Sequence, residues 1–169
     1  MRVTAERKAI MMTEQRFLVP LDLSGYADDQ IVDYAIGLAS QLGAHVTLLH
    51  VMQSLSFAGA EMGVTVPYAY FESLEAEIIS RMHAYLERVR AAGLRGERLV
   101  VHGVPFQVIL ETAKTQQVTL ILMGTHSRTG LQHLFLGSVA EKVVRLAQCP
   151  VLVVRQPTVV PVLSVEPVA

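Results

Sequence analysis

The 169-residue sequence contains no tryptophan and one cysteine, and only 6% of its residues are aromatic. A single cysteine, Cys149, excludes a disulfide within the chain and leaves no cysteine cluster with the spacing of a metal site. Cys149 precedes Pro150 at the start of an apolar segment. We expect a buried, inert thiol there, with a redox role as the lesser alternative.

Charge is also scarce and balanced, with 17% charged residues, of which 14 are basic and 15 acidic. The absence of any Lys or Arg run excludes the basic surface that binds nucleic acid. No long uncharged apolar segment occurs, so we expect no membrane span. The first residues are charged and their apolar run is too short for a signal peptide, so we expect a cytoplasmic protein.

Two catalytic motifs are missing as well. The sequence has no Gly-Lys-Ser or Gly-Lys-Thr ending of a P-loop, so no lysine is placed on a terminal phosphate. It has no Gly-x-Ser-x-Gly turn for acyl chemistry. We therefore expect no fast phosphoryl transfer, and at most slow hydrolysis of a nucleotide.

What is abundant is apolar sequence, at 51% of the residues, in a chain of single-domain length. Five short apolar segments alternate with four segments of helical periodicity, which predicts an α/β fold: a three-layer, doubly wound, five-stranded parallel sheet. The expected strands are Phe17–Leu21, His45–Val51, Glu97–His102, Val118–Met123 and Val151–Arg155. The expected helices are Asp28–Leu42, Tyr68–Ala92, Pro105–Gln116 and Ser138–Gln148.

Three segments lie outside this pattern. Residues 1–15 form an N-terminal extension to the domain, which spans 16–155, and residues 156–169 form a C-terminal arm. Prolines in the arm exclude a central strand, which leaves an oligomer contact or a frayed end. The long connection Gln53–Pro67 is apolar enough to contact a ligand or partner, or to pack on itself.

The segment after the fourth expected strand is rich in glycine, with Gly124, Gly130 and Gly137, and Ser138 follows. Glycines allow backbone N–H groups to approach a ligand, and a helix beginning at Ser138 would favour an anion such as phosphate. Ser138 is also suited to cap that helix. The alternative is that the glycines only shape a turn.

Several of these segments together closely resemble the universal stress protein family. The resemblance covers most of the chain, from about Arg16 to Arg155, and its C-terminal third is the most specific part. The matching segments are Val19–Ser24, Val46–Val51, His102–Pro105, Met123–Leu131, Gly137–Val143 and Cys149–Val154. The resemblance implies the strand order 3-2-1-4-5, in which Asp22 and Gly124 both face the crevice at the switch point, where such sheets bind ligands.

In the nucleotide-binding branch of this family, the loop pattern is glycine, two residues, a second glycine, nine residues, a third glycine, and then Ser or Thr. The corresponding positions here are Gly124, Ser127, Gly137 and Ser138. Ser127 replaces the second glycine: it adds a hydroxyl near the phosphates but resists a positive φ. The resemblance implies bound ATP, with Mg²⁺ or Mn²⁺ bridging its phosphates.

The resemblance also distributes the ligand contacts. Adenine would meet Asp22 and Val46, and the ribose would meet Gly124. The full set of expected binding residues is Pro20, Leu21, Asp22, Val46, Met123, Gly124, Ser127, Arg128, Gly130, Gly137, Ser138 and Val139.

Some of these residues have competing structural roles. Asp22 can instead close a turn or cap the first helix, and Val46 by itself is indistinguishable from a core valine. An arginine such as Arg128 is often only solvated. We expect structural roles for His50 and His102, and neither a titrating nor a metal-binding role for His126 and His133, because no acidic or cysteine ligand lies at a useful spacing.

Two functions follow from different classes. The first is a regulatory protein of the stress response that binds ATP; the second is a nucleotide-free interaction module of the same family, which Ser127 favours. A slow ATPase is a weaker third reading. Both leading readings predict a homodimer through the apolar edge strand Val151–Arg155, with the C-terminal arm as a further contact.

Overall fold

The computed structural model describes residues 14–23, 25–53, 68–125 and 137–155. These residues form five strands and four helices that alternate along the chain. In order they are β1 (Arg16–Pro20), α2 (Tyr26–Leu42), β2 (His45–Met52), α4 (Tyr68–Ala91), β3 (Gly96–His102), α5 (Pro105–Thr115), β4 (Leu120–Gly124), α6 (Ser138–Leu146) and β5 (Val151–Val154).

The strands form one parallel sheet in the order β3-β2-β1-β4-β5. The expected α/β fold and strand order are thereby confirmed. Because β1 lies between β2 and β4, the chain reverses its direction of winding at the β1–β4 pair.

Alternate side chains of the central strands enter two separate cores. Phe17 and Val19 of β1 pack with α2 and α4, whereas Leu18 between them packs with α5 and α6. Leu122 and Ile121 of β4 divide in the same way. The continuous apolar runs are thus explained by burial on both faces of the sheet, one face to each pair of helices.

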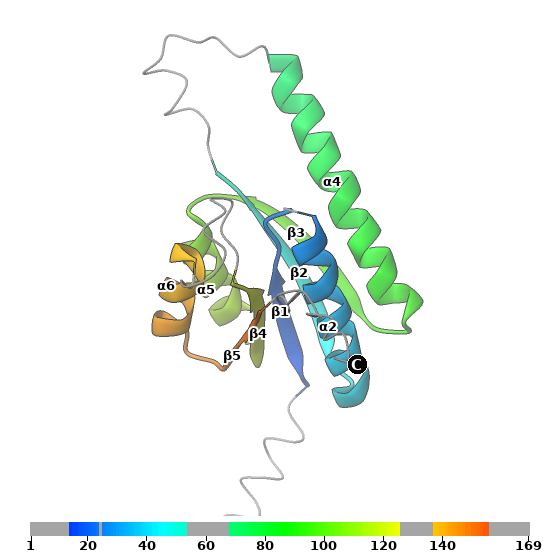
Figure 1. Ribbon diagram of the computed structural model, residues 1–169, viewed down its shortest axis with the longest axis vertical. Coiled ribbons are helices and arrows are strands. Elements are labelled where there is room, and N and C mark those ends of the chain that lie inside the picture. Colours follow the sequence, from blue (N-terminus) through cyan, green and yellow to red (C-terminus); the bar gives the residue numbers. More distant parts are fainter. Residues whose placement is uncertain (1–13, 24, 54–67, 126–136, 156–169) are drawn as a thin grey trace, which may run out of the picture.

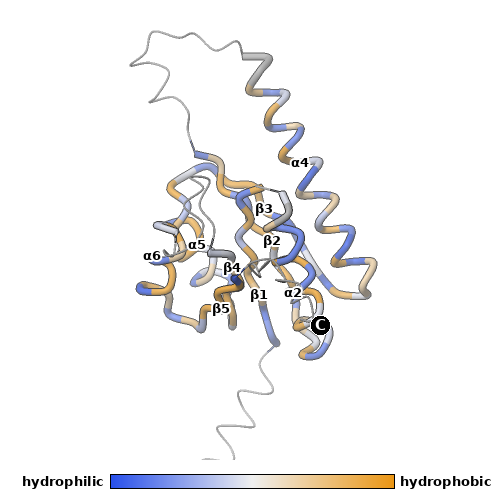
Figure 2. Tube along the Cα trace, in the orientation of Figure 1, coloured by the Kyte–Doolittle hydropathy of each residue, from blue (hydrophilic) through white to orange (hydrophobic). Residues whose placement is uncertain are grey.

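Figure 1 shows the resulting three layers, with α2 and α4 on one side of the sheet and α5 and α6 on the other. In Figure 2 hydrophobic residues predominate along the inner strands, whereas hydrophilic and hydrophobic residues alternate along the helices. Each helix therefore presents one apolar side to the sheet and one polar side to water.

Helix α2 begins two residues before the expected start, because its first turn is closed by Gly25. The Gly25 carbonyl accepts hydrogen bonds from the N–H groups of Asp28 and Asp29, at 2.9 and 3.3 Å. Helix α6 ends at Leu146, before the expected Gln148, since Ala147 is extended, with ψ 142°.

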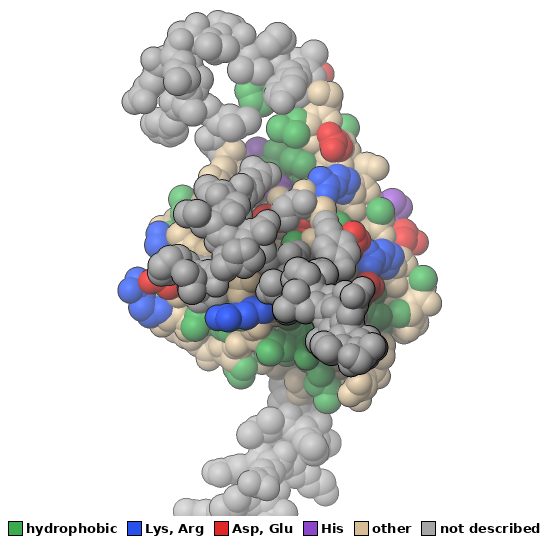
Figure 3. Space-filling model, viewed as in Figure 1, with side chains coloured by type: hydrophobic (Ala, Val, Ile, Leu, Met, Phe, Trp, Pro, Cys, Tyr) green, Lys and Arg blue, Asp and Glu red, His purple; other side chains and the backbone are tan. Residues whose placement is uncertain are grey.

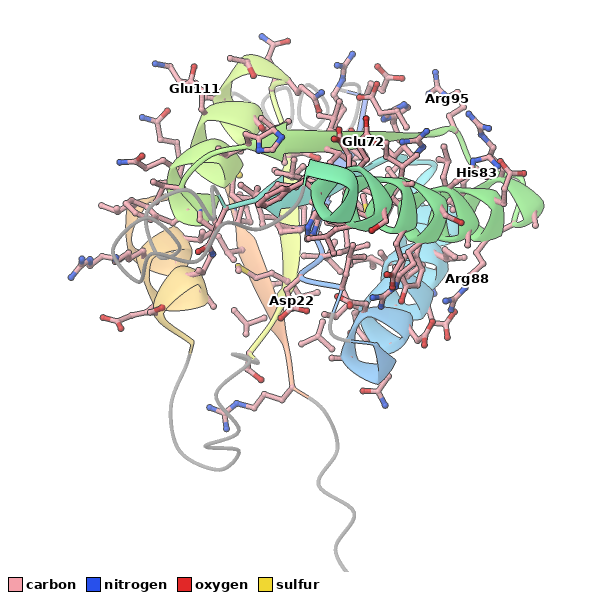
Figure 4. All side chains as sticks on the ribbon, turned by 90° about the horizontal axis from the view of Figure 1, so that it is seen from above. Asp22, Glu72, His83, Arg88, Arg95 and Glu111 are labelled. Carbon is pink, nitrogen blue, oxygen red and sulfur yellow. The ribbon has the colours of Figure 1, made fainter. Side chains whose placement is uncertain are left out.

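Helix α4 is the longest of the described helices, with 24 residues, and its N-terminal half extends beyond the sheet (Figure 1). Its C-terminal half is attached to α2 by Arg88, which bonds to the carboxylates of Asp29 and Asp33. Figure 4 shows Arg88 on the side of α4 that faces α2. These exposed ion pairs fix the relative position of the two helices more than they stabilise the fold.

On the face seen in Figure 3, basic and acidic side chains are interspersed, as the balanced composition suggests. Among the described residues, no helix is long and apolar enough to cross a membrane. The expectations for residues 1–13, 54–67 and 156–169 lie outside the described part of the chain.

Replacing Gly96 by alanine tests the contact between α4 and β3. An added Cβ would lie 2.9 Å from Val89 Cγ1 and 3.2 Å from the Val46 carbonyl oxygen. We expect Gly96→Ala to lower the free energy of unfolding by about 1–2 kcal/mol, measured by urea denaturation.

Gly37 in α2 is the matched control, because an added Cβ meets nothing within 4 Å there. Gly37→Ala should stabilise the protein by roughly 0.5–1 kcal/mol through helix propensity. Equal effects of the two substitutions would contradict the packing of α4 on Gly96.

Candidate functional site

A cavity of about 620 Å³ opens at the carboxyl ends of the strands. It is lined by residues that follow β1, by the ends of β2, β3 and β4, and by the first turn of α6. Helix α4 also lines the cavity, with Phe71, Leu74 and Ile78. The volume is that of a small-molecule site, and most of the lining is apolar.

Leu21, in the turn after β1, contacts β2 through both its backbone N–H and its carbonyl. The Leu21 N–H donates to the Leu49 carbonyl at 2.8 Å, and His50 Nδ1 lies 2.8 Å from the Leu21 carbonyl. Because a carbonyl only accepts, Nδ1 carries the proton. His50 is buried and therefore has the structural role expected of it. His50 also lines the cavity, as does His102, which is exposed.

The end of β4 and the start of α6 also meet at the cavity. The Gly137 N–H donates to the Thr125 carbonyl at 3.1 Å, which joins the two ends of the glycine-rich segment. The first N–H groups of α6 have no acceptor within their own helix, and they carry the positive end of the helix dipole. This end of the cavity is suited to an anion.

Ser138 does not cap α6, contrary to expectation. The N-cap residue is Gly137, and no side-chain hydrogen bond caps this helix. Ser138 is instead the exposed first residue of the helix and lines the cavity. Its hydroxyl thus belongs to the first turn of α6, beside the backbone N–H groups that favour an anion, and does not precede the helix as a cap would.

Asp28, expected only as the first residue of a helix, is a buried carboxylate in the cavity wall. Its side chain is 1% exposed, and its Oδ2 accepts a hydrogen bond from the Gly25 N–H at 3.2 Å. It thereby takes the capping role that we had considered for Asp22. The signal that would have revealed it is an acidic residue at the third helical position, where side chains reach back to the N-cap N–H.

Burial raises the pKa of Asp28 to about 6, and the nearby charge of Asp22 adds to this effect. The backbone hydrogen bonds from Gly25 and Asp22, together with the charge of Arg81 on α4, oppose it. Arg81 also bonds to Tyr85, whose own pKa is raised by burial and by Asp28. A titratable group perturbed in this way beside a cavity is typical of functional sites.

Eight of the expected binding residues line the cavity, and Figure 4 shows Asp22 between the layer of α2 and α4 and the layer that contains α6. They are Pro20, Leu21, Asp22, Met123, Gly124, Gly137, Ser138 and Val139. Ser127, Arg128 and Gly130 lie outside the described residues, as do His126 and His133.

Val46 is not brought to the cavity. It is fully buried near the amino end of β2, where it pairs with Phe17, whereas the cavity lies at the carboxyl end. Val51, five residues further along the same strand, lines the cavity instead. Of these two valines, Val51 rather than Val46 is therefore placed to contact a ligand in the cavity.

No group of three or more metal-ligating side chains occurs within the described ranges. Cys149 is half-buried beside α5, and burial raises the pKa of its thiol. A raised pKa lowers the fraction of reactive thiolate, which agrees with the expected inert thiol.

A parallel doubly wound sheet with a cavity at its switch point defines the class of α/β proteins that hold a small ligand beyond their strand ends. Within that class, the profile of the universal stress protein family matches residues 14–155. The chain therefore belongs to the universal stress protein family.

Curated relatives agree with this assignment. The chain is 31% identical over 145 residues to the universal stress protein MJ0531 of Methanocaldococcus jannaschii, covering 85% of this chain and 83% of that protein. It is 30% identical over 146 residues to the universal stress protein YxiE of Bacillus subtilis, covering 83% and 98%.

Solved structures share the fold. Protein MJ0577 of Methanocaldococcus jannaschii has a TM-score of 0.73 at 25% identity, covering 87% of this chain and 99% of that one. A universal stress protein from Archaeoglobus fulgidus in complex with dAMP has a TM-score of 0.59 at 20% identity, covering 84% and 98%. A universal stress protein in complex with cAMP has a TM-score of 0.62 at 22% identity, covering 84% and 97%.

The pKa of Asp28 predicts how stability changes with pH. Because the folded pKa is about 6, above the ordinary 3.8, the folded state holds a proton that the unfolded state has lost between these values. The contribution of Asp28 is therefore most favourable below pH 4 and is lost as the pH rises through 6. Since one pKa unit corresponds to about 1.4 kcal/mol, roughly 2–3 kcal/mol should be lost by pH 8.

Asp28→Asn should remove this dependence. We expect the free energy of unfolding of the wild type, relative to the variant, to fall by roughly 2–3 kcal/mol between pH 4 and pH 8. Denaturation curves at several pH values measure this difference, and a constant offset between the two proteins would show that Asp28 has an ordinary pKa.

Proposed function

We propose that this protein binds ATP in the cavity, with Mg²⁺ or Mn²⁺ bridging the phosphates, and acts as a regulatory protein of the stress response. The observation that carries the proposal is the cavity of about 620 Å³, which brings the Asp22 turn, the end of β4 and the first turn of α6 together. Hydrolysis, if it occurs, is slow, because the sequence lacks a P-loop lysine.

The two ends of the cavity suit the two ends of a nucleotide. The first turn of α6, with Gly137 and Ser138, offers backbone N–H groups and a hydroxyl to phosphate oxygens. A divalent cation bound to these phosphates would neutralise part of their charge. Arg128, together with Ser127 and Gly130 in the same segment, is expected to join them.

The opposite end suits a planar base. Leu21, Val51 and Met123 provide apolar contacts, and Asp22 provides an acceptor for an exocyclic amine. Relatives with this fold are known in complex with dAMP and cAMP, and both ligands carry adenine. These complexes support an adenine nucleotide here.

Gly137→Val tests the phosphate end. The dihedral angles of Gly137, φ −56° and ψ 147°, are accessible to any residue, so the substitution adds bulk at the cavity without backbone strain. We expect the affinity for ATP with Mg²⁺, measured by calorimetry, to fall by at least about tenfold, which corresponds to about 1.4 kcal/mol. The same substitution at Gly37, in open space on α2, should leave affinity unchanged.

Nucleotide released by denaturing the freshly purified protein should be identified by mass spectrometry in parallel. An empty preparation that also fails to bind ATP with Mg²⁺ or Mn²⁺ would refute nucleotide binding. The nucleotide-free interaction module would then be the better reading.

We also infer a homodimer formed through β5. This strand is at the edge of the sheet, and all four of its valine and leucine side chains are only half-buried. An apolar edge strand favours pairing with a second copy, to which the C-terminal arm would add. The cytoplasmic location expected from the sequence remains a prediction.

Sedimentation at micromolar concentration tests the dimer. We expect twice the 18.5 kDa mass of the chain, because unpaired β5 edges would associate. A mass equal to one chain would contradict pairing through β5.

A further inference from the structure

The turn that presents Asp22 to the cavity has an unusual backbone. Leu23 has φ 60° and Gly25 has φ 100°, so two of the residues that follow Asp22 are in the left-handed region. For leucine this conformation is unfavourable and persists only where the surroundings enforce it. The turn therefore needs contacts that hold it.

The Asp28 carboxylate supplies such contacts. It accepts hydrogen bonds from the backbone N–H groups of Gly25 and Asp22, at the two ends of the turn. An ionised carboxylate accepts several N–H groups at once, and bonds to a charged acceptor are roughly twice as strong as neutral ones. A protonated carboxyl has one oxygen fewer to offer.

Several ionisable groups surround Asp28. Asp22 faces it from the turn, Asp29 adjoins it on α2, and Arg81 and Tyr85 approach it from α4. Glu75 and Glu77 on α4, His50 on β2 and His102 on β3 line the same cavity. Asp28 is the most buried of the acidic side chains in the described part of this cavity.

We propose that Asp28 is a positioning residue: its ionised carboxylate holds the turn that presents Asp22 to the ligand, and its protonation releases the turn and weakens binding. The weakening of binding rests on the proposed nucleotide function; the hold on the turn does not. Because the pKa of Asp28 is about 6, the change falls within mildly acidic pH.

The turn itself is tested by NMR titration of the full-length protein. We expect the Gly25 amide resonance to shift with a midpoint near pH 6, because its acceptor loses its charge there. The shift should be absent in Asp28→Asn and retained in Asp33→Asn. Asp33 is the matched control, since it is on the same helix, is exposed, and does not line the cavity.

Binding of ATP with excess Mg²⁺ is measured by calorimetry from pH 5 to pH 8 for the same three proteins. At pH 5 about one molecule in eleven keeps Asp28 ionised, so wild-type affinity should fall about tenfold from its value at pH 8. Asp28→Asn should bind weakly at every pH. Comparing each profile with that of Asp33→Asn cancels protonation of the nucleotide itself.

The NMR and binding experiments together distinguish the hold of Asp28 on the turn from the proposed nucleotide function. Unchanged affinity in Asp28→Asn, or tighter wild-type binding at pH 5, would overturn the proposal, the latter by showing that charge repulsion with the anionic ligand dominates. A Gly25 amide that does not titrate would overturn it as well. No ATP binding by any protein, with a titrating Gly25 amide, would refute the nucleotide function but support the hold of Asp28 on the turn.

Discussion

The parallel pairing of β1 with β4 is the constraint on which the rest of the structure depends. The helix after β1 covers one face of the sheet, and the helix after β4 covers the other. The segments that follow β1 and β4 leave these neighbouring strands toward opposite faces of the sheet, so neither helix fills the space between them. A cavity at this place is a consequence of the strand order, and the residues around it decide what it holds.

Much of the fold could be predicted, because a strand that is buried on both faces of the sheet is recognisable in the sequence as a continuous apolar segment. β2 and β4 are examples, and the helices opposite them follow from their periodicity. Helix ends were less accurate, since they depend on single hydrogen bonds. The Gly25 carbonyl extends α2 by two residues, and the extended Ala147 shortens α6.

The residues that line the cavity could be predicted where they directly follow a strand. They could not be predicted where the choice depends on position within a strand or on burial by distant segments. Pro20 to Asp22 and Gly137 to Val139 line one cavity, as expected, because chain order places them at neighbouring strand ends. Val46 was misplaced because valines on one strand look alike in sequence, while only Val51 is at the cavity end. Asp28 was missed because its burial arises from tertiary packing, and its charged neighbour Arg81 is on α4, which is distant in sequence. Its buried charge costs global stability while it organises a local turn, a trade that is common at functional sites.

The hydrogen bond between Gly137 and Thr125 has a consequence for how such proteins diversify. It holds the two ends of the intervening segment together, so that β4 and α6 are joined by a direct backbone contact as well as by the chain between them. The entropy of closing a loop grows only with the logarithm of its length, and insertions or deletions there would cost the domain little. Changes of sequence in this segment can therefore alter what the cavity binds at little cost to the fold.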